Sequence, residues 1–166
     1  MFRPIDILPS RLGLKWNLSR EQCLQALGLA ASAQTGVCIT VDVSIEGSQY
    51  NIDLLFNEQG GLNRIQVDVY ESQSFEDEEY TTEELQSIEA RFQDYYNRLV
   101  DYSRLTLGPP RFSGMWGSVG YPEDETEWQI TYWTHPEGRL QIEFDQPDRI
   151  FPFVVRVVCY QVEEPL

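Results

Sequence analysis

The feature that most constrains this chain is a strict alternation of apolar and polar residues, repeated in three neighbouring segments. Apolar side chains occupy every second position over 37–45, 50–56 and 65–69. A period of two places the apolar side chains on one face of a β-strand, so that face is buried and the other meets solvent. Residues 47–48 and 57–61 are rich in turn-forming Gly, Ser and Asn. The three segments therefore predict an antiparallel meander.

Two capping boxes predict the starts of two helices. Ser19 with Gln22, and Thr81 with Glu84, have the spacing in which each side chain bonds the other residue's backbone amide. The first helix is short, whereas the second continues until just before Gly108. Its apolar stripe, at three- and four-residue steps, predicts a core-facing side. The stripe comprises Leu85, Ile88, Phe92, Tyr95, Tyr96, Leu99 and Tyr102.

The remaining segments predict further strands over 112–119, 127–134, 140–144 and 150–160. Pro152 cannot donate to a ladder, so it is expected at a strand start, a bulge or a sheet edge. Together the elements predict an α+β fold with an antiparallel sheet of about six or seven strands and two helices packed on one face. The other face would be polar, and binding is expected there.

The chain is long enough for one domain over 1–166, within which 12–71 and 80–162 would be subdomains. The order helix, strands, helix, strands suggests a diverged tandem repeat of helix plus meander. At a spacing of 78 residues the halves match at Tyr50 and Trp128, Ile52 and Ile130, Gly60 and Gly138, and Leu62 and Leu140. The alternative is that two meanders with the same apolar period share part of this match without common descent.

The charge balance is strongly acidic, with 27 Asp and Glu against 12 Lys and Arg and a formal net charge of −15. Such a surface repels nucleic acid and anionic membranes and favours a basic partner, unless the charge serves only solubility. The absence of a long apolar run predicts a cytoplasmic protein without signal peptide or membrane span. Cys23, Cys38 and Cys159 are widely spaced, which predicts reduced thiols buried in the core.

Catalytic chemistry is not encoded in a recognisable motif. His135 is the one histidine, and it lies in a hairpin turn where it would have no fixed partner, so neither a triad nor a histidine-based metal site is expected. The acidic runs lack the spacing of a calcium loop, and Gly114 and Gly117 lack the lysine of a phosphate-binding loop. We therefore expect no enzyme activity, no cofactor and no dedicated metal site. A pair of acid and base carboxylates is neither supported nor excluded by the sequence.

Two acidic segments that carry aromatic residues are the best candidates for a binding surface. Carboxylates beside aromatic anchors steer a basic partner and supply the dominant contacts. The alternative is that both segments are solvated loops. The candidate partner-binding residues are Phe75, Glu76, Asp77, Glu78, Glu79, Tyr80, Glu83, Glu84, Tyr121, Glu123, Asp124, Glu125 and Glu127.

The stretch 14–28, with Trp16, Ser19, Leu24 and Leu27-Gly28, resembles the opening of small bacterial helix-plus-meander domains. These are of the type found in the outer-membrane assembly lipoprotein E group and the β-lactamase inhibitor protein, and the resemblance implies a helix followed by a meander. In size, acidity and lack of catalytic groups the chain also resembles, in type, the immunity proteins of bacterial toxin systems.

The leading hypothesis is a binding protein, of the inhibitor or immunity type, that neutralises a basic toxin or enzyme through its acidic, aromatic-containing surface. A second hypothesis is a small-ligand binder or enzyme with a pocket of carboxylates and aromatics. A third is a structural adaptor, and the oligomeric state is left open. The residues proposed for such a pocket are Trp116, Trp128, Tyr132 and Trp133.

Overall fold

The computed structural model of this chain describes residues 2–29, 36–71, 80–123, 125–145 and 153–162. The described helices are two short 3-10 helices and two α-helices: η1 Pro4–Ile7, η2 Pro9–Leu12, α1 Arg20–Ala26 and α2 Thr82–Leu107. The described strands are β1 Cys38–Ile45, β2 Ser48–Phe56, β3 Leu62–Glu71, β4 Phe112–Met115, β5 Gln129–His135, β6 Gly138–Asp145 and β7 Val154–Tyr160.

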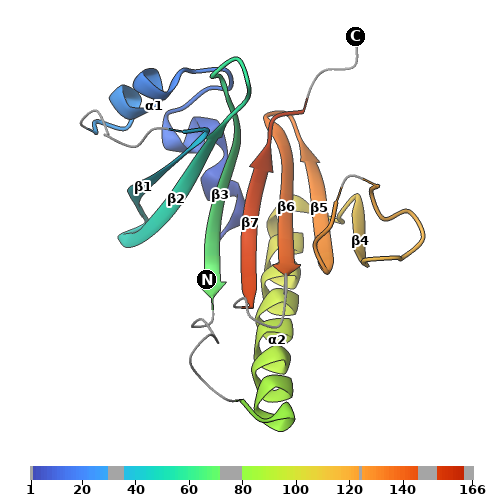
Figure 1. The fold of residues 1–166 in the computed structure, drawn as a ribbon. Helices are drawn as coiled ribbons and strands as arrows, with labels where there is room; N and C mark the ends of the chain where they lie inside the picture. Colours follow the sequence, from blue (N-terminus) through green and yellow to red (C-terminus); the bar gives the residue numbers. More distant parts are fainter. Residues whose placement is uncertain (1, 30–35, 72–79, 124, 146–152, 163–166) are drawn as a thin grey trace.

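The strands form one open sheet in the order β1-β2-β3-β7-β6-β5-β4, and each pairing is antiparallel (Figure 1). It contains two three-stranded meanders, β1–β3 and β5–β7, which meet where β3 pairs with β7, and β4 is added at the edge beside β5. The predicted α+β class and the antiparallel sheet are confirmed. Within the described residues, no helix is long and apolar enough to cross a membrane.

The long helix α2 covers one face of the sheet behind β6 and β7 (Figure 1). Both predicted capping boxes are present, at Ser19 and at Thr81. The predicted stripe contributes Phe92, Tyr96 and Leu99 to the core, where they are fully or almost fully buried. We call the opposite side of the sheet the second face.

The N-terminal 3-10 helices were not predicted from the sequence, yet they complete the core. Ile7 is fully buried and Leu8 nearly so, and η1 contacts β6 and β7. A proline at the first position starts each of these helices. Four-residue helices are too short to show a period of their own, which is why the apolar pattern did not reveal them.

Three expectations need correction or lie outside the described residues. The strand expected over 112–119 ends at Met115, because Ser118 donates back to the Met115 carbonyl in a tight turn. Cys38 is exposed rather than in the core, since the alternation of β1 turns Ile39 inward and Cys38 outward. Pro152 lies outside the described residues.

The sheet order bears on the suggested duplication. The 78-residue spacing aligns β2 with β5 and β3 with β6, whereas the boundary between the meanders is formed by β3 and β7. A diverged tandem repeat therefore stays a prediction.

Candidate functional site

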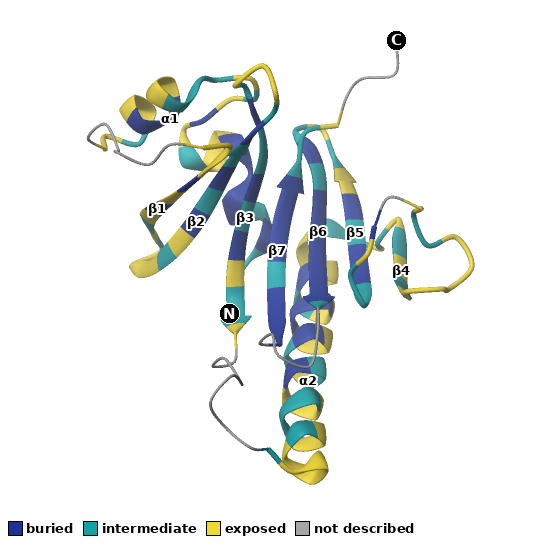
Figure 2. Ribbon diagram, in the orientation of Figure 1, coloured by how far each residue is buried: buried dark blue, intermediate teal, exposed yellow. Residues whose placement is uncertain are grey.

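The second face carries polar residues at alternate positions of β6. Arg139, Gln141 and Glu143 share this face because residues two apart on a strand point the same way. The partners opposite them on β7 are Tyr160, Val158 and Arg156. Gln141 and Glu143 are fully buried, and burial is clear in the dark colour of β6 (Figure 2). A polar side chain with no exposure needs a cover above the sheet.

The cover is the connection between β4 and β5, residues 116–128, of which all but 124 are described. We call it the β4–β5 connection. Its Glu125, only 7% exposed, accepts a hydrogen bond from the Arg139 guanidinium. The Gln141 amide nitrogen donates to Glu125 Oε2 and to Glu143 Oε1, each over 3.1 Å. Glu125 therefore ties the connection to β6 through both charge and hydrogen bonds.

Three carboxylates converge beneath this connection. Glu125, Glu127 and Glu143 each place a carboxylate oxygen within 4.8 Å of the other two. We call these three residues the glutamate cluster. Burial, with a smaller contribution from the charge of Glu127, raises the pKa of Glu143 to about 7. Burial also raises the pKa of Glu125, against the opposing effect of Arg139.

Guanidinium and phenol groups surround the cluster. The Tyr160 ring lies between two guanidinium groups, with Arg139 at 4.5 Å and Arg64 at 4.9 Å from its centroid. The Tyr160 hydroxyl donates to Glu143 Oε1 at 2.9 Å. Arg156 donates to both carboxylate oxygens of Asp68, at 2.5 and 3.2 Å. Positive charge is thus present, but its close contacts are with Glu125 and Asp68.

A second feature of the β4–β5 connection is its exposed apolar turn. Met115, Trp116 and Val119 are 46%, 71% and 101% exposed and lie within five consecutive residues. We call these three residues the hydrophobic tip. The tip is held by the turn in which Ser118 Oγ accepts from the Met115 amide. The connection projects beyond β4, away from the rest of the sheet (Figure 1).

Comparisons of this chain with protein-family models, with curated proteins and with solved structures found no match.

The predicted partner-binding residues fall at two separate places. Those at the start of α2 lie below the sheet in Figure 1, whereas those of the β4–β5 connection lie beside β4. At the helix, Glu83 and Glu84 are both exposed, and Glu84 forms the capping box with the N-cap residue Thr81. Tyr80 is half-buried. The five predicted residues from Phe75 to Glu79 lie outside the described residues, and so does Asp124.

On the connection, the predicted residues divide between surface and interior. Glu123 is exposed, Glu127 is half-buried and Glu125 is buried. Tyr121 is half-buried, with its ring edge against Phe112. Of these three carboxylates, only that of Glu123 is fully at the surface.

The side chains of the four aromatics of the alternative pocket do not share one face of the sheet, although the Trp116 amide donates to the Trp128 carbonyl. Trp133 is buried on the helix-covered face, and Trp128 stacks on Phe144 of that face. Tyr132 instead pairs with Gln141 on the second face, and Trp116 is on the tip. His135 lies at the end of β5 as expected, but it has a partner, because its Nδ1 accepts from the Glu137 amide.

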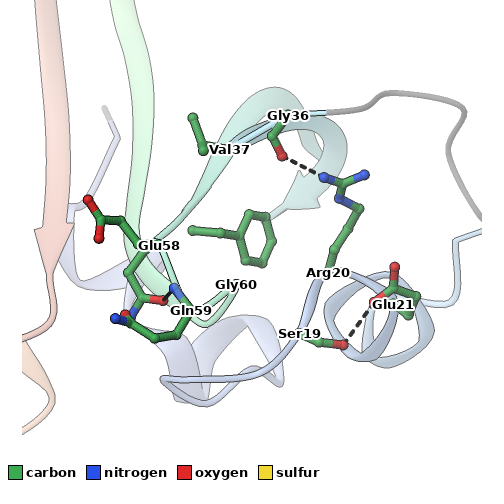
Figure 3. Close-up of a pocket in the computed structure, with 10 residues that line it drawn as sticks. Ser19, Arg20, Glu21, Gly36, Val37, Glu58, Gln59 and Gly60 are labelled. Carbon is green, nitrogen blue, oxygen red and sulfur yellow. Dashed lines mark hydrogen bonds between the residues drawn. The ribbon is translucent and has the colours of Figure 1, made fainter.

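A separate hollow lies at the end of the sheet, between α1 and the β2–β3 turn (Figure 3). Arg20 reaches across it to donate to the Gly36 carbonyl at 2.5 Å. Ser19 donates to Glu21 and also caps the helix through the Gln22 amide. Arg20 therefore joins α1 to the segment just before β1, whereas the contacts of Ser19 lie within the start of α1.

Sequence reasoning did not single out Arg139, Gln141 and Glu143. It used Leu140, Ile142 and Phe144, the apolar phase of β6, to predict the strand. The signal available was the opposite phase: three long polar residues at i, i+2 and i+4 must share the second face. That Gln141 and Glu143 are buried could not be read from the strand, because their cover comes from another segment.

Proposed function

We propose that the protein acts by binding a basic protein through the β4–β5 connection. The observation that carries this proposal is the hydrophobic tip, where Trp116 is 71% and Val119 is 101% exposed on a projecting turn. Tryptophan is the residue type most enriched among dominant interface contacts. A large exposed apolar side chain on a projection is more readily explained by an interface than by folding.

The charge of the chain supports a basic partner. The net charge is −15, and Glu123 of the same connection is exposed. Complementary charge raises association rates, while apolar contacts at the centre slow dissociation. The resemblance in type to immunity proteins makes a basic toxin or enzyme, blocked by the bound chain, the partner class that we propose.

The test compares two variants that each remove one exposed apolar side chain. Trp116→Ala removes the centre of the tip, and Leu105→Ala removes a side chain that is 82% exposed at the end of α2. A basic protein captured by the wild-type chain at low salt is purified, and its Kd is measured by calorimetry. We expect Trp116→Ala to raise Kd at least about tenfold and Leu105→Ala to leave it unchanged.

Salt dependence provides the second arm of the test. Glu123→Lys should slow association at low salt and have a smaller effect at high salt, because exposed charges are screened. Equal affinity of wild type and Trp116→Ala would contradict the proposal. Failure of the wild-type chain to retain any basic protein from source-cell lysate at low salt would contradict it as well.

A further inference from the structure

The glutamate cluster has the arrangement of a site for a small cation, independent of the proposed partner interface. Oxygens that bind one hard divalent ion at about 2.1 to 2.5 Å lie at most roughly 5 Å from one another. The carboxylate oxygens of Glu125, Glu127 and Glu143 all lie within 4.8 Å of one another. Glu125 and Glu143 are buried, and the half-buried Glu127 leaves the cluster a side open to solvent.

Two buried oxygens at this place have no hydrogen-bond donor among the described residues. Glu143 Oε2 and Gln141 Oε1 both belong to side chains with 0% exposure, and neither accepts a hydrogen bond from the part of the chain that the structure describes. The nearest charged contact of Glu143 Oε2 is the Arg156 guanidinium at 4.0 Å, which is beyond hydrogen-bond distance. Buried acceptors without a donor are costly, so a native structure normally supplies one.

The Gln141 amide lies between two members of the cluster. The amide nitrogen donates to Glu125 and to Glu143, each over 3.1 Å, and thus bridges the two carboxylates. The amide oxygen is bonded to the same carbon atom as this nitrogen. An amide oxygen is a common ligand of hard cations beside carboxylates. Rotation of this amide would exchange its nitrogen and oxygen, and it would then offer the oxygen to an ion between the carboxylates.

The charges leave the cluster negative. Its three carboxylates share the direct hydrogen bond of one guanidinium, that of Arg139, among the described residues. Arg156 makes its short contacts with Asp68, and Arg64 lies over the Tyr160 ring. A divalent cation would offset this excess charge and satisfy the unpaired oxygens together.

We infer that Glu125, Glu127 and Glu143, with the Gln141 side-chain oxygen, form a binding site for a hard divalent cation such as Mg²⁺, Ca²⁺ or Mn²⁺. The ligands are carboxylate and amide oxygens without sulfur or imidazole, which selects hard cations over soft ones. Because Glu125 and Glu127 belong to the β4–β5 connection and Glu143 to β6, the ion would join this connection to the sheet.

The test uses the full chain, stripped of metal by a chelator and then dialysed. Thermal unfolding is followed at pH 7.5 with 1 mM Mg²⁺, Ca²⁺ or Mn²⁺, with sodium chloride at equal ionic strength as the reference. We expect at least one ion to raise Tm by about 3 °C or more, because an ion that binds only the folded state stabilises it. Terbium(III), whose emission would be sensitised by Tyr160, whose hydroxyl donates to Glu143, serves as a second probe.

Two variants distinguish ion binding at the glutamate cluster from ion binding to the acidic surface in general. Glu127→Gln removes the half-buried ligand, and Glu123→Gln removes an exposed carboxylate of the same connection. We expect Glu127→Gln to weaken the response to the ion at least tenfold and Glu123→Gln to keep it. Equal responses of the two variants would show binding to surface charge only and overturn the inference.

Absence of any ion response would also overturn it. If Tm changes with pH but not with the three ions, and terbium emission in the wild type equals that of Glu127→Gln, the carboxylates share protons instead of a metal. Neither result bears on the hydrophobic tip, so failure of the cation site and failure of the proposed interface are distinguishable.

Discussion

The meanders β1–β3 and β5–β7 differ most on the second face of the sheet. In the first, Thr40, Asp53 and Gln66 lie side by side across the strands and are joined by hydrogen bonds of 2.6 and 3.1 Å near solvent. In the second, Gln141 occupies the corresponding row, paired with Val158 at the centre of the sheet, and is fully buried.

The difference lies in what covers the strands, because β6 alternates apolar and polar residues as β1–β3 do. The β4–β5 connection turns a polar strand face into an interior, and the interior then contains carboxylates at a cost in solvation. Where the same polar pattern faces water, solvent can satisfy the polar groups and a buried hydrogen-bond network is not required. An unusual polar site can thus arise when a loop closes over an ordinary amphipathic sheet.

The hairpin glycines should show the largest difference between the meanders. A Cβ at Gly138, between β5 and β6, would lie 2.3 Å from the Tyr160 carbonyl oxygen, and its φ is +151°. Gly47, between β1 and β2, has φ +83° and open space around a new Cβ. We expect Gly138→Ala to lower the free energy of unfolding by about 3 kcal/mol or more and Gly47→Ala by about 1 kcal/mol. Urea unfolding checks both, and equal losses would show that the close approach to β7 is relieved easily.

The cover of the second meander should depend on Glu125. Glu125→Ala removes the partner of Arg139 and one of the two acceptors of the Gln141 amide, at a buried place. We expect a loss of about 2 to 3 kcal/mol in the free energy of unfolding. Asp53→Ala, which removes hydrogen bonds to Thr40 and Gln66 nearer the solvent, should cost less than about 1 kcal/mol. A larger loss for Asp53→Ala would mean that the covered network does not stabilise the fold.

A buried charge should be dispensable when no cation is bound. In chelator at pH 8, Glu143→Gln should raise the free energy of unfolding by about 1 kcal/mol, because it removes a buried charge whose contact with Arg156 is as long as 4.0 Å and keeps an acceptor for Tyr160. Asp68→Asn, which weakens the partly exposed ion pair with Arg156, should instead lower it by up to about 1 kcal/mol.

The effect of Glu143→Gln on the free energy of unfolding should depend on pH. The pKa of Glu143 is raised from 4.5 to about 7, so the folded state binds the extra proton between these values. Stability from this group is present below about pH 4.5 and is lost as the pH rises through 7. The gain from Glu143→Gln should therefore disappear at pH 4.5. A gain that persists there would assign it to packing instead of charge.

Local patterns predicted the elements of the fold, while contacts between distant segments determined the site. The alternation over 37–45 and the capping boxes at Ser19 and Thr81 act within a few residues, so the sequence was sufficient to predict β1, α1 and α2. Burial of Glu125 and Glu143 depends on a connection folding over strands that follow it in the chain. No local period encodes that contact. The exposure of Trp116 was missed for the same reason, since a strand was expected where a turn lies.

The smallest effect we expect concerns thiol reactivity, and it again separates the two meanders. Cys38 is exposed on β1, whereas Cys159 of β7 and Cys23 of α1 are fully buried. Burial raises the pKa of Cys23 to about 11 and that of Cys159 to about 12, so both stay protonated and shielded at pH 8. Ellman's reagent should label one thiol rapidly in the native chain and all three in urea, and Cys38→Ser should abolish the rapid phase. Rapid labelling of Cys159 would show that the core of the covered meander opens more readily than its burial implies.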